Sequence, residues 1–172
     1  MKKYFTYVRT AREVCQKPCI IEFEGGSYTS FCNAHSLALT KEPCGAIELY
    51  TDVDRYPDVG KLVKRESIPR KVDFSKVFAE AKSKGYKVTK AEVNGTPNKF
   101  MMHYDGAYFR LGLFDITYRI IDNGGEVTVY HKEGNNTAPI TIENELGVAM
   151  VLPVRCDAEF VEENGFIVIE VN

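Results

Sequence analysis

The chain has 172 residues, of which 44% are hydrophobic and 27% are charged, and its net charge is −2. This length and composition predict one globular domain or two small ones with a substantial core. No apolar run approaches membrane-spanning length, and the first residues lack the apolar segment of a signal peptide. We therefore expect a cytoplasmic protein that does not associate with membranes.

The small net charge hides an uneven distribution along the chain. Residues 1–90 carry 17 Lys and Arg against 11 Asp and Glu, a balance of +6, whereas residues 91–172 carry 5 against 13, a balance of −8. Such an asymmetry can produce one face that attracts phosphates, although an ordinary solvated surface explains it equally well.

The sequence contains no motif that points to catalysis or metal binding. The five cysteines are scattered without a C-x-x-C pair, which argues against a disulfide framework and a zinc ribbon and predicts small buried or half-buried residues. His35, His103 and His131 lack metal-ligand spacing, and no nucleophile elbow, Walker loop or dinucleotide fingerprint occurs. We expect no cofactor, no metal and no catalytic residue, but a site assembled from distant residues stays open.

The N-terminal half is expected to contain a short helix followed by strands. Apolar residues recur at helical spacing over 4–17, and Pro18 ends that segment. Gly25-Gly26 separates apolar residues 19–23 from 27–31, which predicts a hairpin, and residues 36–40 and 45–50 are further strand candidates. The basic stretch around Pro69, residues 64–72, is interpreted as a linker.

The C-terminal half begins with the clearest helix signal in the chain. Asp73 is a favourable N-cap, an apolar stripe follows, and Gly85 supplies the stop. After it we expect a strand at 86–93 and a hairpin across Asp105-Gly106. The segment at 114–122 fits either a strand or a short helix. A strand at 126–132, a hairpin at 139–153 ended by Pro153, and a last hairpin at 157–172 follow.

Three segments, taken in order, resemble the bacterial DNA sliding clamp, the beta subunit of DNA polymerase III. Residues 139–155, PITIENELGVAMVLPVR, resemble the family's C-terminal segment, which ends in V-M-P-M-R or V-M-P-V-R. Residues 32–38, CNAHSLA, resemble its T-D-G-H-R-L-A loop, with Ala34 and Ser36 replacing the glycine and the arginine. Residues 54–63, DRYPDVGKLV, resemble its G-x-F-P-D-Y-x-x-V-I segment, and Leu113-Phe114-Asp115-Ile116 is similar to a family helix start, which favours a short helix there.

The resemblance implies an α+β, DNA-clamp-like fold of antiparallel sheets with two or three short helices. It implies a reduced clamp of phage or mobile-element type, with a clamp-like subdomain at 1–63, a linker at 64–72, a second subdomain at 73–156 and a C-terminal hairpin extension at 157–172. The family's first domain and the room for a second helix between Thr40 and Asp54 are missing, which leaves ring closure open. The extension is expected to cover the edge strand before it or to occlude part of a pocket beside Pro153.

The resemblance also implies a function and a site. It implies a non-catalytic replication accessory or processivity factor that binds double-stranded DNA and short hydrophobic peptides of replication proteins, and that forms a homo-oligomer. DNA-facing lysines would be Lys76, Lys82 and Lys84. Two alternatives stay open: a clamp-fold interaction module that neither forms a ring nor binds DNA, and a small-molecule enzyme whose site is not visible in the sequence. Carried over position by position, the peptide pocket comprises Leu37, Pro57, Leu62, Val151, Leu152, Pro153, Val154 and Arg155.

Overall fold

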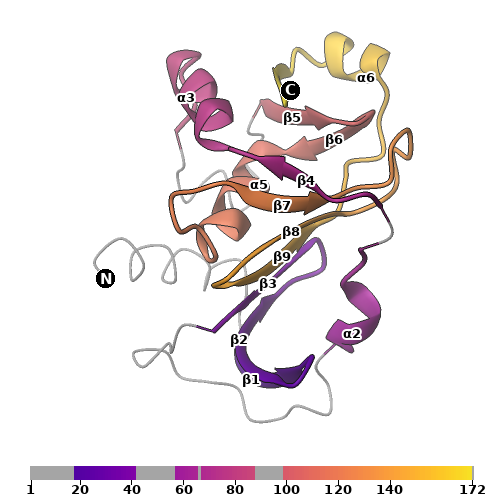
Figure 1. The fold of residues 1–172 in the computed structure, drawn as a ribbon. Helices are drawn as coiled ribbons and strands as arrows, with labels where there is room; N and C mark the ends of the chain where they lie inside the picture. Colours follow the sequence, from indigo (N-terminus) through magenta and orange to yellow (C-terminus); the bar gives the residue numbers. More distant parts are fainter. Residues whose placement is uncertain (1–17, 42–56, 66, 88–98, 172) are drawn as a thin grey trace.

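The computed structural model of the chain describes residues 18–41, 57–65, 67–87 and 99–171. Over these ranges the protein contains a seven-stranded sheet, a three-stranded sheet and four short helices (Figure 1). The predicted α+β class is confirmed, but the described residues hold more helices than the two or three expected.

The large sheet is antiparallel throughout and has the order β1-β2-β3-β9-β8-β7-β4. Its first hairpin turns at Glu24 and Gly25, both of which have positive φ. The predicted hairpins at 19–31 and 139–153 and the strands at 36–40 and 126–132 are therefore confirmed. The strands of this sheet are β1 (Cys19–Phe23), β2 (Gly26–Cys32), β3 (Ser36–Thr40), β4 (Arg70–Val72), β7 (Val127–Tyr130), β8 (Ile140–Asn144) and β9 (Gly147–Val151).

One continuous sheet contains strands from both predicted subdomains. The central pairing joins β3 to β9, from Ser36 opposite Val151 to Thr40 opposite Gly147. The predicted linker at 64–72 ends in β4, which pairs with β7 at the far edge of the same sheet. Strand β9 lies between β3 and β8, so it is not an edge strand that a C-terminal extension could cover.

Strand alternation divides the large sheet into two apolar faces. On one face, Ala38 and Val151 pack into the main core with helices α3 (Ser75–Ser83) and α5 (Leu111–Arg119). On the other face, Leu37 and Met150 belong to a smaller apolar cluster together with residues of α2 (Val59–Leu62). Neighbouring positions in β3 and β9 thus point into different cores.

The predicted helix after Asp73 forms as α3, with its N-cap one residue later than expected. Phe74 is the N-cap, while the Asp73 carboxylate accepts a hydrogen bond from the Ser75 amide at 2.9 Å. The predicted stop is confirmed, because Gly85 has a φ of 93° and the amide of Tyr86 donates to the carbonyl of Ala81 at 2.9 Å. The ambiguous segment is also a helix, α5, and seven of its nine residues are buried.

The C-terminal segment is not the predicted hairpin. Residues 158–163 form helix α6 (Ala158–Glu163), because the Asp157 carboxylate caps it by accepting from the Phe160 amide at 2.9 Å. Gly165, with a φ of 63°, ends the helix in a left-handed turn. Strand β10 (Ile167–Glu170) then pairs with β5 (Phe100–Tyr104) in parallel, and β6 (Ala107–Arg110) completes the small sheet. The small sheet is therefore mixed and not antiparallel as expected.

Three predictions fall wholly or largely outside the described residues: the helix at 4–17, the strand at 45–50 and the strand at 86–93 beyond Lys87. Cys19 is buried and Cys32 and Cys156 are half-buried, as predicted for these three cysteines. In the ranges that the structure describes, no helix is long and apolar enough to cross a membrane.

Candidate functional site

The loop that joins β2 to β3 is hydrogen-bonded to the residue that follows β9. Within the loop, the Asn33 side-chain oxygen accepts hydrogen bonds from the amides of His35 and Ser36, each at 2.7 Å. This arrangement holds a tight turn, as asparagine side chains commonly do. The carbonyl of His35 accepts from the amide of Leu152 at 2.9 Å. The loop carrying His35 and the strand end before Pro153, which are more than a hundred residues apart in sequence, are therefore in contact.

Helix α2 brings residues 57–63 to the same face of the sheet. Val59 and Val63 are buried in one apolar cluster with Leu37 of β3 and Met150 of β9, and Leu62 packs against that cluster. The other members of this cluster are Phe23, Leu39 and Val148, with Ile21, Tyr28 and Cys32 packed against it. The three segments that resemble the clamp family thus meet around Leu37.

Only some of the predicted pocket residues lie at this meeting point. Leu37 and Leu62 share the cluster, and Leu152, whose exposed fraction is 39%, is the first residue after β9 and donates its amide hydrogen to the His35 carbonyl. Val151 is fully buried in the main core on the opposite face, so no partner could reach it. The Val154 amide donates to the Tyr108 carbonyl of β6 at 2.7 Å, which directs the chain toward the small sheet.

The remaining predicted pocket residues differ in exposure: Pro57 and Arg155 are exposed and Pro153 is half-buried. Sequence reasoning missed Val59 and Met150. The alternation that places Val148 and Met150 on one face of β9 is the signal that could have found Met150. We call the group formed by Leu37, Leu62, Met150 and Leu152 the strand-end surface.

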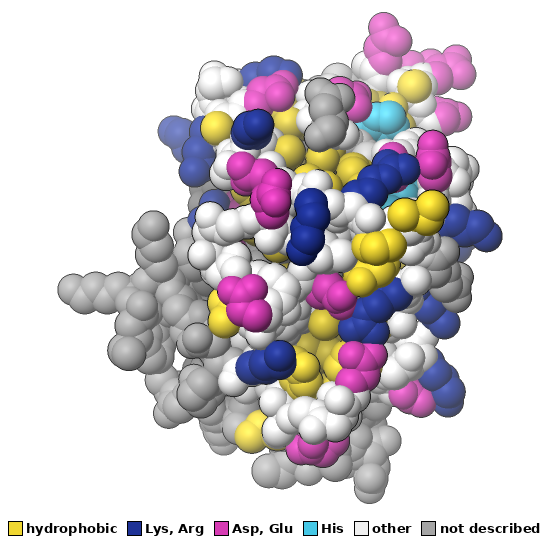
Figure 2. Space-filling view, in the orientation of Figure 1, with side chains coloured by type: hydrophobic (Ala, Val, Ile, Leu, Met, Phe, Trp, Pro, Cys, Tyr) yellow, Lys and Arg dark blue, Asp and Glu magenta, His cyan; other side chains and the backbone are white. Residues whose placement is uncertain are grey.

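Of the predicted DNA-facing lysines, Lys76 and Lys82 lie on α3 and Lys84 is its C-cap, and all three are exposed. Lys84 is already engaged, because its Nζ lies 2.7 Å from Glu80 Oε1 and 3.5 Å from the carbonyl of Val168. On the face that Figure 2 shows, basic and acidic side chains are interspersed. The positive charge that α3 presents is therefore partly offset by its own glutamate.

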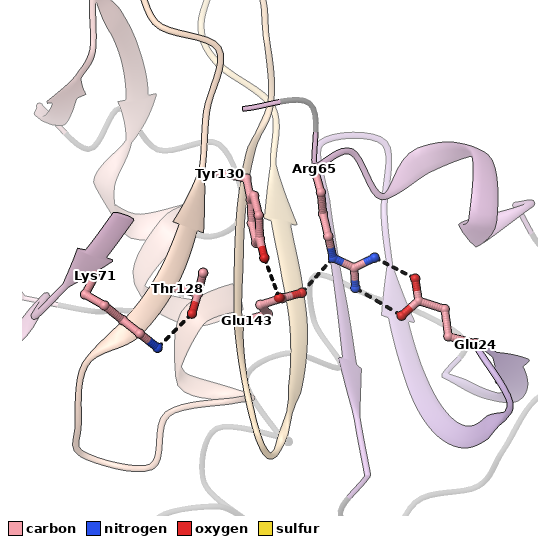
Figure 3. A network of polar contacts seen from close by, with 6 residues as sticks. All are labelled: Glu24, Arg65, Lys71, Thr128, Tyr130 and Glu143. Carbon is pink, nitrogen blue, oxygen red and sulfur yellow. Dashed lines mark hydrogen bonds and ion pairs between the residues drawn. The ribbon is translucent and has the colours of Figure 1, made fainter. Parts of the chain in front are cut away.

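Hydrogen bonds from Arg65 connect the segment after α2 to the large sheet (Figure 3). Its Nε donates to Glu143 on β8 at 2.7 Å, and its two terminal nitrogens donate to Glu24 at 2.5 and 3.2 Å. The Tyr130 hydroxyl donates to the other Glu143 oxygen at 2.8 Å. The hydrogen bonds from Arg65 to Glu24 and Glu143 raise the pKa of the guanidinium above its ordinary value. The guanidinium also lies 5.9 Å from the centre of the Phe23 ring.

The hydrogen bonds of Arg65 stabilise the position of α2, which contributes Leu62 to the strand-end surface. A helix of four residues such as α2 has little stability of its own and depends on tertiary contacts. Arg65 lies three residues beyond the end of α2 and binds one carboxylate in the β1–β2 turn and another on β8. These contacts, with Val59 and Val63 beneath, hold α2 against the sheet.

Two further observations concern the chemistry of the chain. Among the described residues, no group of three or more His, Cys, Asp or Glu side chains is arranged to hold a metal ion. Comparisons of the chain with protein-family models, with curated proteins and with solved structures found no match.

Proposed function

We propose that this protein is a non-catalytic, sliding-clamp-like accessory factor of DNA replication that binds short hydrophobic peptides of partner proteins at the strand-end surface. The observation that carries the proposal is the hydrogen bond between the Leu152 amide and the His35 carbonyl, together with the packing of α2 over Leu37. These two contacts bring together the three segments whose resemblance to the clamp family motivated the proposal. The resemblance supplies the replication context, and the geometry supports the peptide site.

The strand-end surface suits an apolar anchor. Leu152 leaves 39% of its surface in solvent and Leu62 is half-buried, so these two side chains are the ones that a partner can contact, whereas Leu37 and Met150, with exposed fractions of 1% and 5%, belong to the covered cluster. Burying a complete leucine or phenylalanine side chain of a partner contributes about 1.5–3 kcal/mol. Two such anchors with main-chain hydrogen bonds give an affinity near 1 μM, or about −8 kcal/mol.

Peptide binding is tested by fluorescence anisotropy with short labelled peptides that carry paired Leu and Phe anchors. Truncating Leu152 to Ala removes roughly 1 kcal/mol of contact, so the Kd should rise about fivefold. Ile20 on the edge strand β1, which is 50% exposed, provides the matched control, and Ile20→Ala should leave the Kd unchanged. Equal effects of the two substitutions, or no saturable binding by any such peptide, would refute the peptide site.

A second candidate is a clamp-fold interaction module that neither encircles nor binds DNA. The pairing of Lys84 with Glu80 favours it, because it reduces the charge that α3 offers to phosphates. Light scattering and DNA binding at several salt concentrations distinguish the two candidates. A processivity factor requires a closed oligomer and an affinity for double-stranded DNA that falls with salt, and Lys76→Gln with Lys82→Gln should reduce the salt slope by about 2. A monomeric protein with no measurable affinity for DNA would exclude the ring and favour the interaction module.

A further inference from the structure

A cavity of about 250 Å³ lies where the loop after β7 meets the segment that follows α2. It has room for roughly eight water molecules at about 30 Å³ each. None of the predicted peptide-pocket residues lines it, so it is distinct from the strand-end surface. The lining residues are Lys64, Ser67, Tyr130, His131, Lys132, Asn135, Thr137, Ala138 and Pro139.

The loop that forms one wall of the cavity is held by its own hydrogen bonds. The Asn135 side-chain oxygen accepts from the Thr137 amide at 3.0 Å and from the Thr137 hydroxyl at 2.8 Å. The Asn135 amide donates to the Lys132 carbonyl at 3.0 Å, and the Gly134 amide donates to the Asp105 carbonyl at 3.2 Å. The wall is therefore preformed, which lowers the entropic cost of binding a ligand.

Two buried polar side chains at the cavity lack hydrogen-bond partners within the described ranges. His131 is 6% exposed, its ring meets those of Tyr104 and Phe109 edge-on, and neither ring nitrogen is hydrogen-bonded. Burial lowers the pKa of His131 and so favours the neutral imidazole, which has one donor and one acceptor. The Ser67 hydroxyl is also buried without a partner. An unpaired buried polar group costs about 1–3 kcal/mol, so both are unusual in a structural loop.

The charges around the cavity are positive. Lys64 and Lys132 line it, and no carboxylate is among the lining residues that the structure describes. The nearby acids are engaged elsewhere: Glu143 binds Arg65 and Tyr130. Asp105 and Glu133 both bind Arg70, at 2.8 and 3.1 Å. The cavity therefore offers the Lys132 ammonium group, the Ser67 hydroxyl and the His131 ring to an acceptor-rich ligand.

We propose that this cavity binds a small anion through a phosphoryl group, with Lys132 supplying charge and the Ser67 hydroxyl and the neutral His131 ring supplying hydrogen-bond donors. Lysine ammonium groups bind phosphate as point charges, and the tetrahedral phosphoryl group presents several acceptor oxygens to donors arranged around it. The volume fits inorganic phosphate or a small phosphate ester, because drug-sized ligands occupy pockets of about 300–1,000 Å³. This site is independent of the proposed replication function.

The test is thermal unfolding of the full chain with inorganic phosphate and, in a separate arm, glycerol phosphate, against sodium chloride at matched ionic strength. At ten times the Kd, binding should raise the Tm by about 3–6 °C. Lys132→Gln should reduce the affinity about tenfold. Lys99→Gln, at an exposed lysine that does not line the cavity, should leave the affinity unchanged. A larger Tm increase with the ester than with inorganic phosphate identifies the ester as the preferred source of the phosphoryl group.

The position of binding is checked by an NMR titration of the same protein with phosphate. We expect saturable amide shifts that are largest for residues 131–139. Shifts spread evenly over exposed lysines, equal responses of the Lys132→Gln and Lys99→Gln proteins, or no stabilisation beyond that of chloride would each overturn the proposal.

Discussion

Gly147 is the first residue of β9 and faces Thr40 of β3. A Cβ added at this position would lie 1.8 Å from the Leu39 carbonyl oxygen and 2.9 Å from its carbonyl carbon. It would also lie 3.1 Å from a methyl carbon of Ile121. The first two contacts are with backbone, which cannot rotate away, so we expect Gly147→Ala to force the two strands apart.

The geometry sets the size of this effect. Moving the added Cβ to the 3.4 Å at which ordinary contact begins requires a separation of about 1.6 Å, which would break hydrogen bonds at this end of the β3–β9 ladder. Overpacking costs about 1–3 kcal/mol and each hydrogen bond lost about 1 kcal/mol. We expect Gly147→Ala to lower the free energy of unfolding by about 3 kcal/mol or more and the Tm by about 6–12 °C.

Urea unfolding followed by circular dichroism measures this free energy. Gly125→Ala is the matched control, because its Cβ would meet only the Asn123 side-chain oxygen, at an ordinary 3.6 Å. The control should change stability by no more than about 0.5 kcal/mol. If both substitutions prove equally mild, the close β3–β9 approach is wrong, and with it the contact between the His35 loop and the end of β9.

Three further predictions concern polar groups. Burial raises the pKa of Asp115, against the opposing effect of Arg119. The contribution of Asp115 to the free energy of unfolding should therefore fall as pH rises from about 4. Urea unfolding of the wild-type protein and of Asp115→Asn between about pH 4 and 7 should show this difference, and parallel pH profiles would contradict it. Arg65→Met and Glu143→Gln should show a coupling of about 1 kcal/mol in a double-mutant cycle, and purely additive effects would mean that their ion pair contributes nothing. Asp157→Ala should cost about 1 kcal/mol and speed hydrogen exchange in α6, whereas Asp157→Asn, which also caps, should not; equal costs would exclude the capping role.

Much of the local structure follows from short-range pattern. The turn at Glu24-Gly25, the stripe and glycine stop of α3, and the alternation of β8 and β9 involve residues only a few positions apart, so their signals are visible in sequence. The segment 158–163 shows the limit of such reasoning. The sequence predicts a hairpin over 157–172, but the Asp157 cap makes 158–163 a helix, which Gly165 terminates.

The candidate site was predictable only in part. Leu37 and Leu62 were selected by resemblance and do share an apolar cluster, but Val151 was selected with them and faces the opposite core. The alternation of strand side chains explains the difference, since adjacent residues of one strand cannot serve the same face. His131 was dismissed as a metal ligand, and nothing in its neighbours indicated a buried ring beside a cavity.

The amino-acid sequence by itself determined the β1–β2 and β8–β9 hairpins and helix α3 with its glycine stop, because strand alternation, helix stripes and tight turns depend on neighbouring residues. Only the tertiary structure decided that β3 pairs with β9, that β10 lies parallel to β5, and that Arg65 joins Glu24 to Glu143. These contacts join positions that are tens to more than a hundred residues apart. Their formation depends on how the apolar faces of the whole chain are buried together, which no local pattern encodes.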